Sequence, residues 1–202
     1  MPTPFLQKRA SIFSRLHGFT LVELLILMGI LVLLITWVIP SLENFVNGQR
    51  AATQVNQFVT DLQRTRVTAI SGKSPVTLCK STVSRACADT PNGDNCRCVT
   101  GGDWSQGWVM FKDSDNDNVI DSDERVLWLH EGLGGAATLV GNRNVRNRVK
   151  YNALGQASGY NGTLVLCPSG RFDISTRVIV VSAVGRVRSG PASEFSIASC
   201  SP

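Results

Sequence analysis

The chain has 202 residues, 43% of them hydrophobic, and a formal net charge of +5. This hydrophobic fraction is enough for a real core, in one ordinary domain or in two small ones. The charge does not by itself indicate a nucleic-acid partner, because Lys8, Arg9 and Arg15 precede every acid and leave 17 of the 20 bases against 15 acids.

The first predicted element is an apolar helix over residues 19–39. Between Phe19 and Ile39 the only ionisable residue is Glu23. At 1.5 Å per residue this stretch rises about 31 Å, which is enough to cross a bilayer. The three bases before it fit the positive-inside rule, which predicts that everything after Ile39 lies outside the cytoplasm.

An amphipathic helix is predicted to follow over residues 40–72. Apolar side chains recur there at three- and four-residue steps among Asn, Gln, Thr and Arg. The predicted stripe comprises Leu42, Phe45, Val46, Ala52, Val55, Val59, Leu62, Arg66, Val67 and Ile70. Gly72 and Pro75 end the pattern. One face of this helix should therefore carry a globular head.

Residues 73–202 are predicted to form this head, and it should be rich in β-structure. Gly, Asn and Asp separate short runs that are typical of strands. The runs are residues 76–80, 108–112, 125–130, 148–151, 163–167 and 177–182. The expected fold class is α+β, with a long N-terminal helix, first transmembrane and then amphipathic, packed against an antiparallel β-sheet head.

The segment Gly18-Phe19-Thr20-Leu21-Val22-Glu23 before the apolar run resembles the prepilin signature of type IV pilins and type II secretion pseudopilins. A secretory signal peptide has the opposite order, with its apolar stretch before the cleavage site. In the head, the order of landmarks looks like the GspH/FimT group of minor pilins and pseudopilins. These landmarks are Trp104, Gly107-Trp108-Val109-Met110-Phe111, an Asp-rich loop, residues 177–182, Gly185-Arg186-Val187-Arg188 and a last cysteine. The resemblance implies a type IV pilin-like fold, and only the cysteine-rich insert, residues 81–102, does not match it.

The resemblance also implies how the N-terminus is used. A prepilin peptidase would remove the leader, residues 1–18, by cutting between Gly18 and Phe19, and would methylate the new Phe19 amine. Glu23 would pair with the N-terminal amine of a neighbouring subunit, and Pro40 would kink the helix near the membrane surface. A carboxylate in hydrocarbon costs at least about 2.5 kcal/mol, which agrees with a functional role for Glu23. A glutamate that snorkels to the headgroups is the alternative.

Six cysteines follow the apolar run: Cys79, Cys87, Cys96, Cys98, Cys167 and Cys200. An even number outside the cytoplasm favours disulfides, although six cysteines allow 15 pairings. A nested arrangement would join Cys79 to Cys98 and Cys87 to Cys96, and would leave Cys167 with Cys200. A zinc site built from the first four cysteines is the alternative, but their spacing lacks the paired Cys-x-x-Cys of structural zinc sites.

An acidic segment in the head has the spacing of an EF-hand loop. Acids occupy positions 1, 3, 5, 9 and 12, and Val119 stands where a backbone carbonyl would be a ligand. The acids are Asp113, Asp115, Asp117, Asp121 and Glu124. The sixth position is Asn118 in place of glycine, and asparagine tolerates the required positive φ. Ca²⁺ is the one cofactor that the sequence indicates; a solvated acidic turn without metal is the alternative.

Basic residues gather later in the head and could grip double-stranded DNA. Residues 143–188 hold eight bases against one acid: Arg143, Arg146, Arg148, Lys150, Arg171, Arg177, Arg186 and Arg188. The Gly185-Arg186-Val187-Arg188 element is similar to one that family members acting in DNA uptake use. In an extended segment Arg186 and Arg188 would share a side. The alternative is that these arginines pair with the acidic region of the same or an adjacent subunit.

The predicted function is that of a minor pilin or pseudopilin in pilus biogenesis, priming or the tip. Its partners would be prepilin peptidase, other major and minor pilins or pseudopilins, and the bacterial inner membrane, with the head in the periplasm and later in a pilus or pseudopilus. DNA capture during transformation and a type II secretion pseudopilus are the alternatives. We expect no enzyme, because His17 and His130 are the only histidines and no nucleophile pattern accompanies them.

Overall fold

The computed structural model of the chain describes residues 19–82 and 96–202, apart from the side chains of residues 37–41, 43 and 44. The chain divides into two compact units, Met1–Leu42 and Glu43–Pro202. The helix α1 (Leu21–Gly72) passes from the first unit into the second. The described strands all belong to the second unit, which we call the head.

The C-terminal end of α1 is a Schellman-type cap. The amide of Lys73 donates to the carbonyl of Ile70 and the amide of Ser74 donates to the carbonyl of Ala69, each at 3.3 Å. The residue with left-handed backbone is Lys73, at φ 48°, and not the preceding Gly72. The predicted end is therefore correct to within a residue, but the glycine is not the capping residue.

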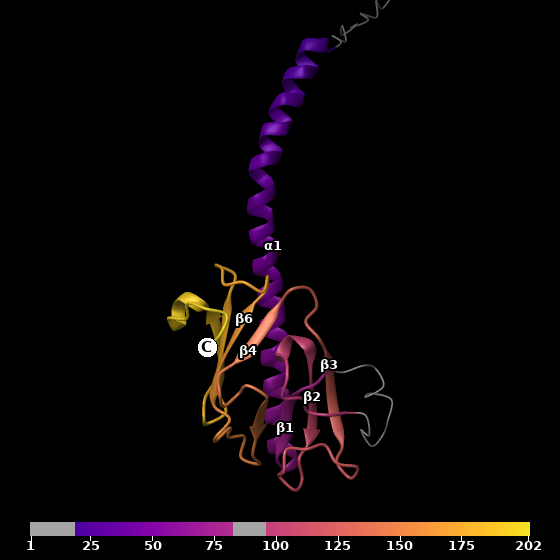
Figure 1. Cartoon of the computed structure of the whole chain (residues 1–202), viewed down its shortest axis with the longest axis vertical. Helices are drawn as coiled ribbons and strands as arrows, with labels where there is room; N and C mark the ends of the chain where they lie inside the picture. The colour runs from indigo at the N-terminus through magenta and orange to yellow at the C-terminus, as the bar shows by residue number, and fades with distance from the viewer. Residues whose placement is uncertain (1–18, 83–95) are drawn as a thin grey trace, which may run out of the picture. The chain divides into compact units, whose positions relative to one another are not determined.

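The described strands of the head form two four-stranded antiparallel sheets (Figure 1). In spatial order the first sheet contains β3 (Val126–Glu131), β2 (Gly107–Lys112), β1 (Val76–Lys80) and β5 (Arg148–Tyr151). The second contains β4 (Thr138–Gly141), β6 (Gly162–Cys167), β7 (Arg177–Val181) and β8 (Val187–Pro191). Two short 3-10 helices, η2 (Trp104–Gln106) and η3 (Ala192–Phe195), accompany them. The α+β fold class is confirmed.

The two strands that sequence analysis missed, β4 and β8, are the two edges of the second sheet. β4 has only four residues, and β8 carries Arg188, Ser189, Gly190 and Pro191, which are poor or unremarkable strand formers. Proline is tolerated at an edge because no further strand needs its missing amide hydrogen. These strands are therefore defined by pairing with β6 and β7 and not by their own composition.

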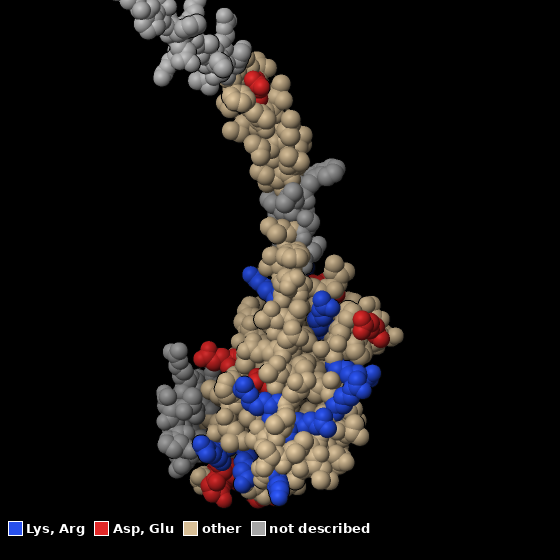
Figure 2. All heavy atoms as spheres, turned by 180° about the vertical axis from the view of Figure 1, so that it is seen from behind, with Lys and Arg blue, Asp and Glu red and all other residues tan. Residues whose placement is uncertain are grey.

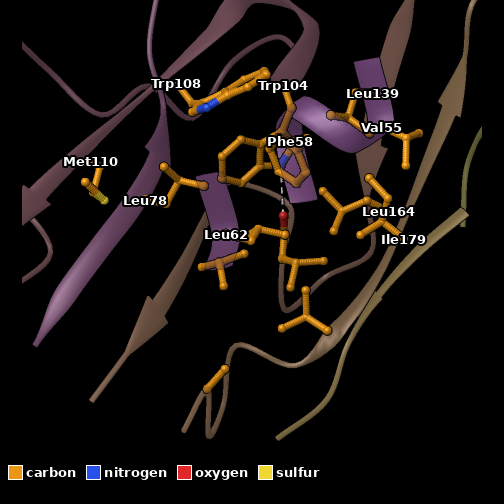
Figure 3. Close-up of a cluster of buried hydrophobic side chains, with 14 of the residues drawn as sticks. Val55, Phe58, Leu62, Leu78, Trp104, Trp108, Met110, Leu139, Leu164 and Ile179 are labelled. Atoms are coloured by element: carbon orange, nitrogen blue, oxygen red, sulfur yellow. Dashed lines mark hydrogen bonds between the residues drawn. The ribbon is translucent and has the colours of Figure 1, made fainter. Parts of the chain in front are cut away.

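The core of the head lies between α1 and both sheets (Figure 3). Its helical stripe repeats at the three- and four-residue steps of a buried helix face: Ala51, Val55, Phe58, Leu62, Thr65 and Ala69. The stripe packs against Leu78 of β1 and against Leu164 and Ile179 of β6 and β7. Phe58 makes edge contacts with Trp104 at 5.2 Å and Trp108 at 4.9 Å between ring centroids.

The predicted apolar stripe needs correction at several positions. Val55 and Leu62 are buried as expected, but Val67 is 63% exposed and Ile70 is 45% exposed, and Phe58 was omitted. The predicted stripe combined residues from two faces of the helix, because both faces carry apolar side chains. Exposed apolar residues on the second face are typical of a surface that contacts another molecule.

Candidate functional site

The first turn of α1 is capped by Thr20. The amide of Glu23 donates to the Thr20 hydroxyl at 3.2 Å, and the amide of Leu24 donates to the Thr20 carbonyl at 3.1 Å. Thr20 and Glu23 have the Thr-x-x-Glu spacing of a capping box, in which a glutamate stabilises the N-terminal turn. The N-cap at Thr20 was readable from this spacing and was not predicted. Phe19, the expected first residue after cleavage, is 74% exposed, and the leader with Gly18 lies outside the described residues.

The N-terminal part of α1 exposes apolar side chains on all of its faces. Every large apolar residue from Leu21 to Ile35 is between 45% and 75% exposed. Within the described part of the chain, no helix is both long and apolar enough to cross a bilayer. α1 includes Pro40, whose predicted kink stays a prediction.

The predicted calcium ligands occupy the connection between β2 and β3, residues 113–124, which we call the acidic loop. Carboxylate oxygens of Asp113, Asp115 and Asp117 lie within 4.8 Å of one another. Asn118, at the sixth position, has φ 68°, the left-handed conformation that an EF-hand loop requires there. Strands, and not helices, flank this loop.

Asp113 anchors the acidic loop to the first sheet. Its side chain is fully buried, and its Oδ2 accepts a hydrogen bond from the Thr77 hydroxyl and pairs with Lys150 Nζ, each at 2.7 Å. Thr77 and Lys150 are cross-strand partners on β1 and β5. The other oxygen, Oδ1, accepts the amide of Asn118 at 3.3 Å. A buried charge needs such partners, because its desolvation is costly.

Glu124 closes the acidic loop at its far end. Its side chain is buried, with the residue 4% exposed, and its Oε1 accepts the amide of Ser114 at 2.6 Å. Burial, and then the nearby charge of Asp113, raise the pKa of the Glu124 carboxyl above its ordinary value. Burial and the neighbouring Asp117 likewise raise the pKa of Asp121. The acidic loop thus carries more negative charge than the positively charged groups in contact with it can neutralise.

The predicted DNA-binding residues fall into two groups. Lys150 is 7% exposed and paired with Asp113, and Arg148 is half-buried with its guanidinium donating to the Asn118 carbonyl at 3.3 Å. These two belong with the acidic loop, which corrects the expectation that Lys150 faces a phosphate backbone. The four exposed members are Arg143, Arg146, Arg186 and Arg188. Seen from behind in Figure 2, Lys and Arg side chains are spread over one face of the head, with acidic side chains mostly near its margins.

Arg66 fastens α1 to two turns of the head and was predicted only as part of the helical stripe. Its Nε donates to the Gly155 carbonyl at 2.9 Å, and its Nη2 donates to the Val184 carbonyl at 3.1 Å. Gly185 follows Val184 with φ 82°, and a Cβ on it would lie 1.9 Å from the Gly155 carbonyl oxygen. The glycine of the Gly-Arg-x-Arg element therefore allows two turns to meet below Arg66.

Two disulfides join described cysteines, Cys79 to Cys98 and Cys167 to Cys200, and both are pairs of the nested arrangement. Cys96 is also disulfide-bonded, while Cys87 lies outside the described residues. The buried Lys80 holds the same end of the insert by donating to the carbonyls of Thr100 and Gly102. Burial lowers the pKa of the Lys80 amino group.

His130 takes part in packing. Its ring stacks on Trp108 with 4.0 Å between centroids and 8° between planes, and its Nδ1 lies against the carbonyl of Glu131. Trp108 in turn donates its indole N–H to the buried carboxylate of Asp61 at 2.9 Å. The imidazole is thus the first of a series of side-chain contacts that connects β3 through β2 to α1.

A family model described as type II transport protein GspH matches residues 54–185. Two solved structures of the type IV minor pilin FimU of Pseudomonas aeruginosa are similar to the chain. The first is 20% identical, with a TM-score of 0.48 over 72% of this chain and 89% of that chain. The second is 21% identical, with a TM-score of 0.47 over 72% and 94%. A comparison of the sequence with curated proteins found no match. Because the family model covers more than half of the sequence, the chain belongs to the GspH family.

Proposed function

We propose that the chain is a minor subunit of a type IV pilus, made as a prepilin and assembled through α1. The observation that carries the proposal is the apolar surface of α1 from Leu21 to Ile35, which is exposed on all faces and contains a single charged residue, Glu23. Such a surface needs lipid or other apolar helices around it. The inner membrane would supply lipid before assembly, and neighbouring subunits would supply helices afterwards.

In this proposal the N-terminus supplies an ionic contact inside the filament. Prepilin peptidase cuts after Gly18, and the methylated amine of Phe19 meets the Glu23 carboxylate of the next subunit. Both groups stand at the start of an apolar helix, where an unpaired charge is costly. Pro40 and the apolar side chains exposed on the head part of α1, such as Phe45 and Val67, then face neighbouring helices. The mechanism is recognition between subunits, without chemistry on a substrate.

A pseudopilus of a type II secretion system would use the same mechanism with different partners. The family description, type II transport protein, keeps this alternative in view. Affinity purification of sheared filaments followed by mass spectrometry distinguishes the two, because type IV pilins and secretion pseudopilins are separate sets of partner chains.

Glu23 offers the decisive variant, because its charge can be removed with little change in the shape of the side chain. Glu23→Gln keeps a side-chain oxygen that can accept a hydrogen bond, as a capping box allows, but removes the charge. We expect cleavage to start the chain at Phe19 with one added methyl, as in the parent protein, and incorporation into filaments to fall by about tenfold or more. Intact mass of the membrane-extracted protein and immunoblots of sheared filaments give the two readouts.

A Thr20→Ser variant is the matched control, because serine keeps the N-cap hydroxyl and the charge of Glu23. It should assemble like the parent. Incorporation of Glu23→Gln at parental levels would contradict the pairing. A chain that still begins at Met1 in the presence of the peptidase would contradict the whole proposal.

A second candidate function is DNA capture by the head. The observation that favours it is that Arg186 and Arg188 are exposed and form no ion pair with the residues that the structure describes. Arg143 and Arg146 share this condition. The arginines are therefore free of intramolecular carboxylate partners in the described chain, and guanidinium groups bind phosphate oxygens through paired hydrogen bonds.

The test is a mobility-shift titration of duplex DNA with the full chain in detergent at several salt concentrations. Arg186→Ala/Arg188→Ala should weaken binding about tenfold and lower the salt slope by about 2. Arg125→Ala/Arg171→Ala is the control, since it removes the same charge from two other exposed arginines. Equal losses in both double variants would reduce the effect to net charge and contradict a site at Arg186 and Arg188.

A further inference from the structure

The acidic loop contains a buried carboxylate oxygen that lacks a partner. Oε2 of Glu124 makes no hydrogen bond within the described residues, although Glu124 is only 4% exposed. An unpartnered buried carboxylate oxygen is unfavourable, and a bound ion is one of the recognised reasons why native proteins retain such a group. This observation concerns a different residue from the cluster of three aspartates, and it arises from burial and not from spacing.

The Glu124 carboxylate belongs to the same loop end as the aspartate cluster. Its Oε1 is held by the amide of Ser114, the residue between the first two aspartates of the cluster. Asp113 and Asp115, the residues on either side of Ser114, are two members of that cluster. The last acid of the loop is therefore folded back against the first ones, as position 12 of a calcium loop folds back on position 1.

The charge of the loop is largely uncompensated. Residues 113–124 contain six acids and no base. Lys150 is the only cation that forms an ion pair with them among the described residues. It sits on Oδ2 of Asp113, while Oδ1 of the same group accepts just one long amide contact, from Asn118. Lys150 thus orients the first carboxylate and leaves the remaining oxygens for a second cation.

We propose that the acidic loop binds one Ca²⁺ ion. Its ligands are five side chains and one main-chain carbonyl: Asp113, Asp115, Asp117, Asp121, Glu124 and the carbonyl of Val119. The ion supplies Glu124 Oε2 with its missing partner and relieves the repulsion among the acids. Through Asp113 and its contacts with Thr77 and Lys150, the ion also fixes the β2–β3 connection against β1 and β5.

The donor set favours calcium over other divalent ions. All proposed ligand atoms are oxygens, whereas zinc sites in proteins are built mainly from cysteine sulfur and histidine nitrogen. Six protein oxygens on one loop suit an ion that accepts six to eight ligands, whereas Mg²⁺ demands a tight octahedron and keeps several waters. The Asx turns of Asp115 and Asp117, whose Oδ1 atoms accept the amides of Asp117 and Val119, leave a second oxygen on each carboxylate.

The experiment is calorimetric titration of CaCl₂ into the full chain in detergent after removal of metal with EDTA, with a thermal unfolding scan in parallel. We expect one ion per chain with a Kd between about 10 µM and 1 mM, the range of sensor and extracellular sites. At about 100 times the Kd, the unfolding midpoint should rise by about 5 °C or more. MgCl₂ at the same concentration should give less than about a third of this rise.

Three variants locate the ion. Glu124→Gln keeps the size of the buried side chain, and Asp115→Asn/Asp117→Asn changes two exposed residues while asparagine keeps the Oδ1 acceptor of each turn. Each should weaken calcium binding by about thirtyfold or more, because charged ligands are lost. Asp123→Asn removes an exposed acid of the same loop outside the ligand set, and should stay within about threefold of the parent. Absence of heat and of any midpoint rise in the parent protein up to about 5 mM CaCl₂, or parental affinity in both ligand variants, would overturn the proposal.

Discussion

Replacing Gly185 with alanine is expected to destabilise the head by about 2 to 4 kcal/mol. Two costs add together at this position. Alanine at φ 82° is strained by about 1 kcal/mol, and its Cβ would lie 1.9 Å from the Gly155 carbonyl oxygen. That oxygen cannot move away without loss, because it accepts the hydrogen bond from Arg66 Nε. Forced backbone displacement in a packed site adds about 1 to 3 kcal/mol.

Gly159→Ala separates these two costs. Gly159 has nearly the same backbone, φ 81°, but no atom lies within 4 Å of the place that a Cβ would occupy. Its substitution should cost only about 1 kcal/mol. Denaturant unfolding of both variants, followed by tryptophan fluorescence, measures the difference. If the two glycines prove equally replaceable, the close approach of the two turns beneath Arg66 does not exist in solution.

Phe58→Ala is expected to cost about 4 kcal/mol of unfolding free energy. Phe58 is fully buried and makes edge contacts with two buried tryptophans, Trp104 and Trp108. Removing a buried phenylalanine costs about 3 to 5 kcal/mol, since apolar burial is lost and a cavity remains. The loss should fall on the whole head, because this ring joins α1 to both β2 and the η2 turn.

Phe45→Ala is the control on the same helix. Phe45 is 63% exposed, so its removal should change the unfolding free energy by less than about 0.5 kcal/mol. The same denaturant experiment measures both. A Phe58→Ala protein with a parental midpoint would mean that the contact of α1 with the head is not made through this ring. Phe45→Ala should instead act on assembly, if its side chain faces a neighbouring helix as proposed.

Elements with a strong local signal could be predicted from the sequence. The helix over residues 21–72 has a long apolar run followed by a helical period, and six strands have β-branched or aromatic residues between turn formers. Edge strand β8 lacks such a signal and forms because β7 offers it a partner. The helix face could be predicted only in part, since Phe58 and Val67 are equally apolar and only the tertiary structure decides which is buried.

The candidate site was predictable in its spacing but not in its surroundings. The order of the proposed ligands can be read directly from residues 113–124, because they all lie in one short segment. The pairing of Asp113 with Lys150 is not, because it depends on β1 lying between β2 and β5 in the sheet. The same strand order places Lys150 in an ion pair with Asp113 and not on the basic surface. Burial of Glu124, on which the calcium proposal depends, is likewise a property of the folded loop and not of the motif.

The shared use of α1 has a mechanical consequence. The helix that extends toward the N-terminus is also the central element of the core, with Ala51, Val55, Phe58, Leu62 and Ala69 inserted between the sheets. A pulling force applied along the helix therefore loads these side chains together, in shear, instead of peeling them away singly. Arg66, held by two carbonyls further along, resists the same displacement. Pulling α1 out of the head would thus require the whole core to break. The resistance of the subunit to force and the folding stability of the head therefore depend on the same contacts.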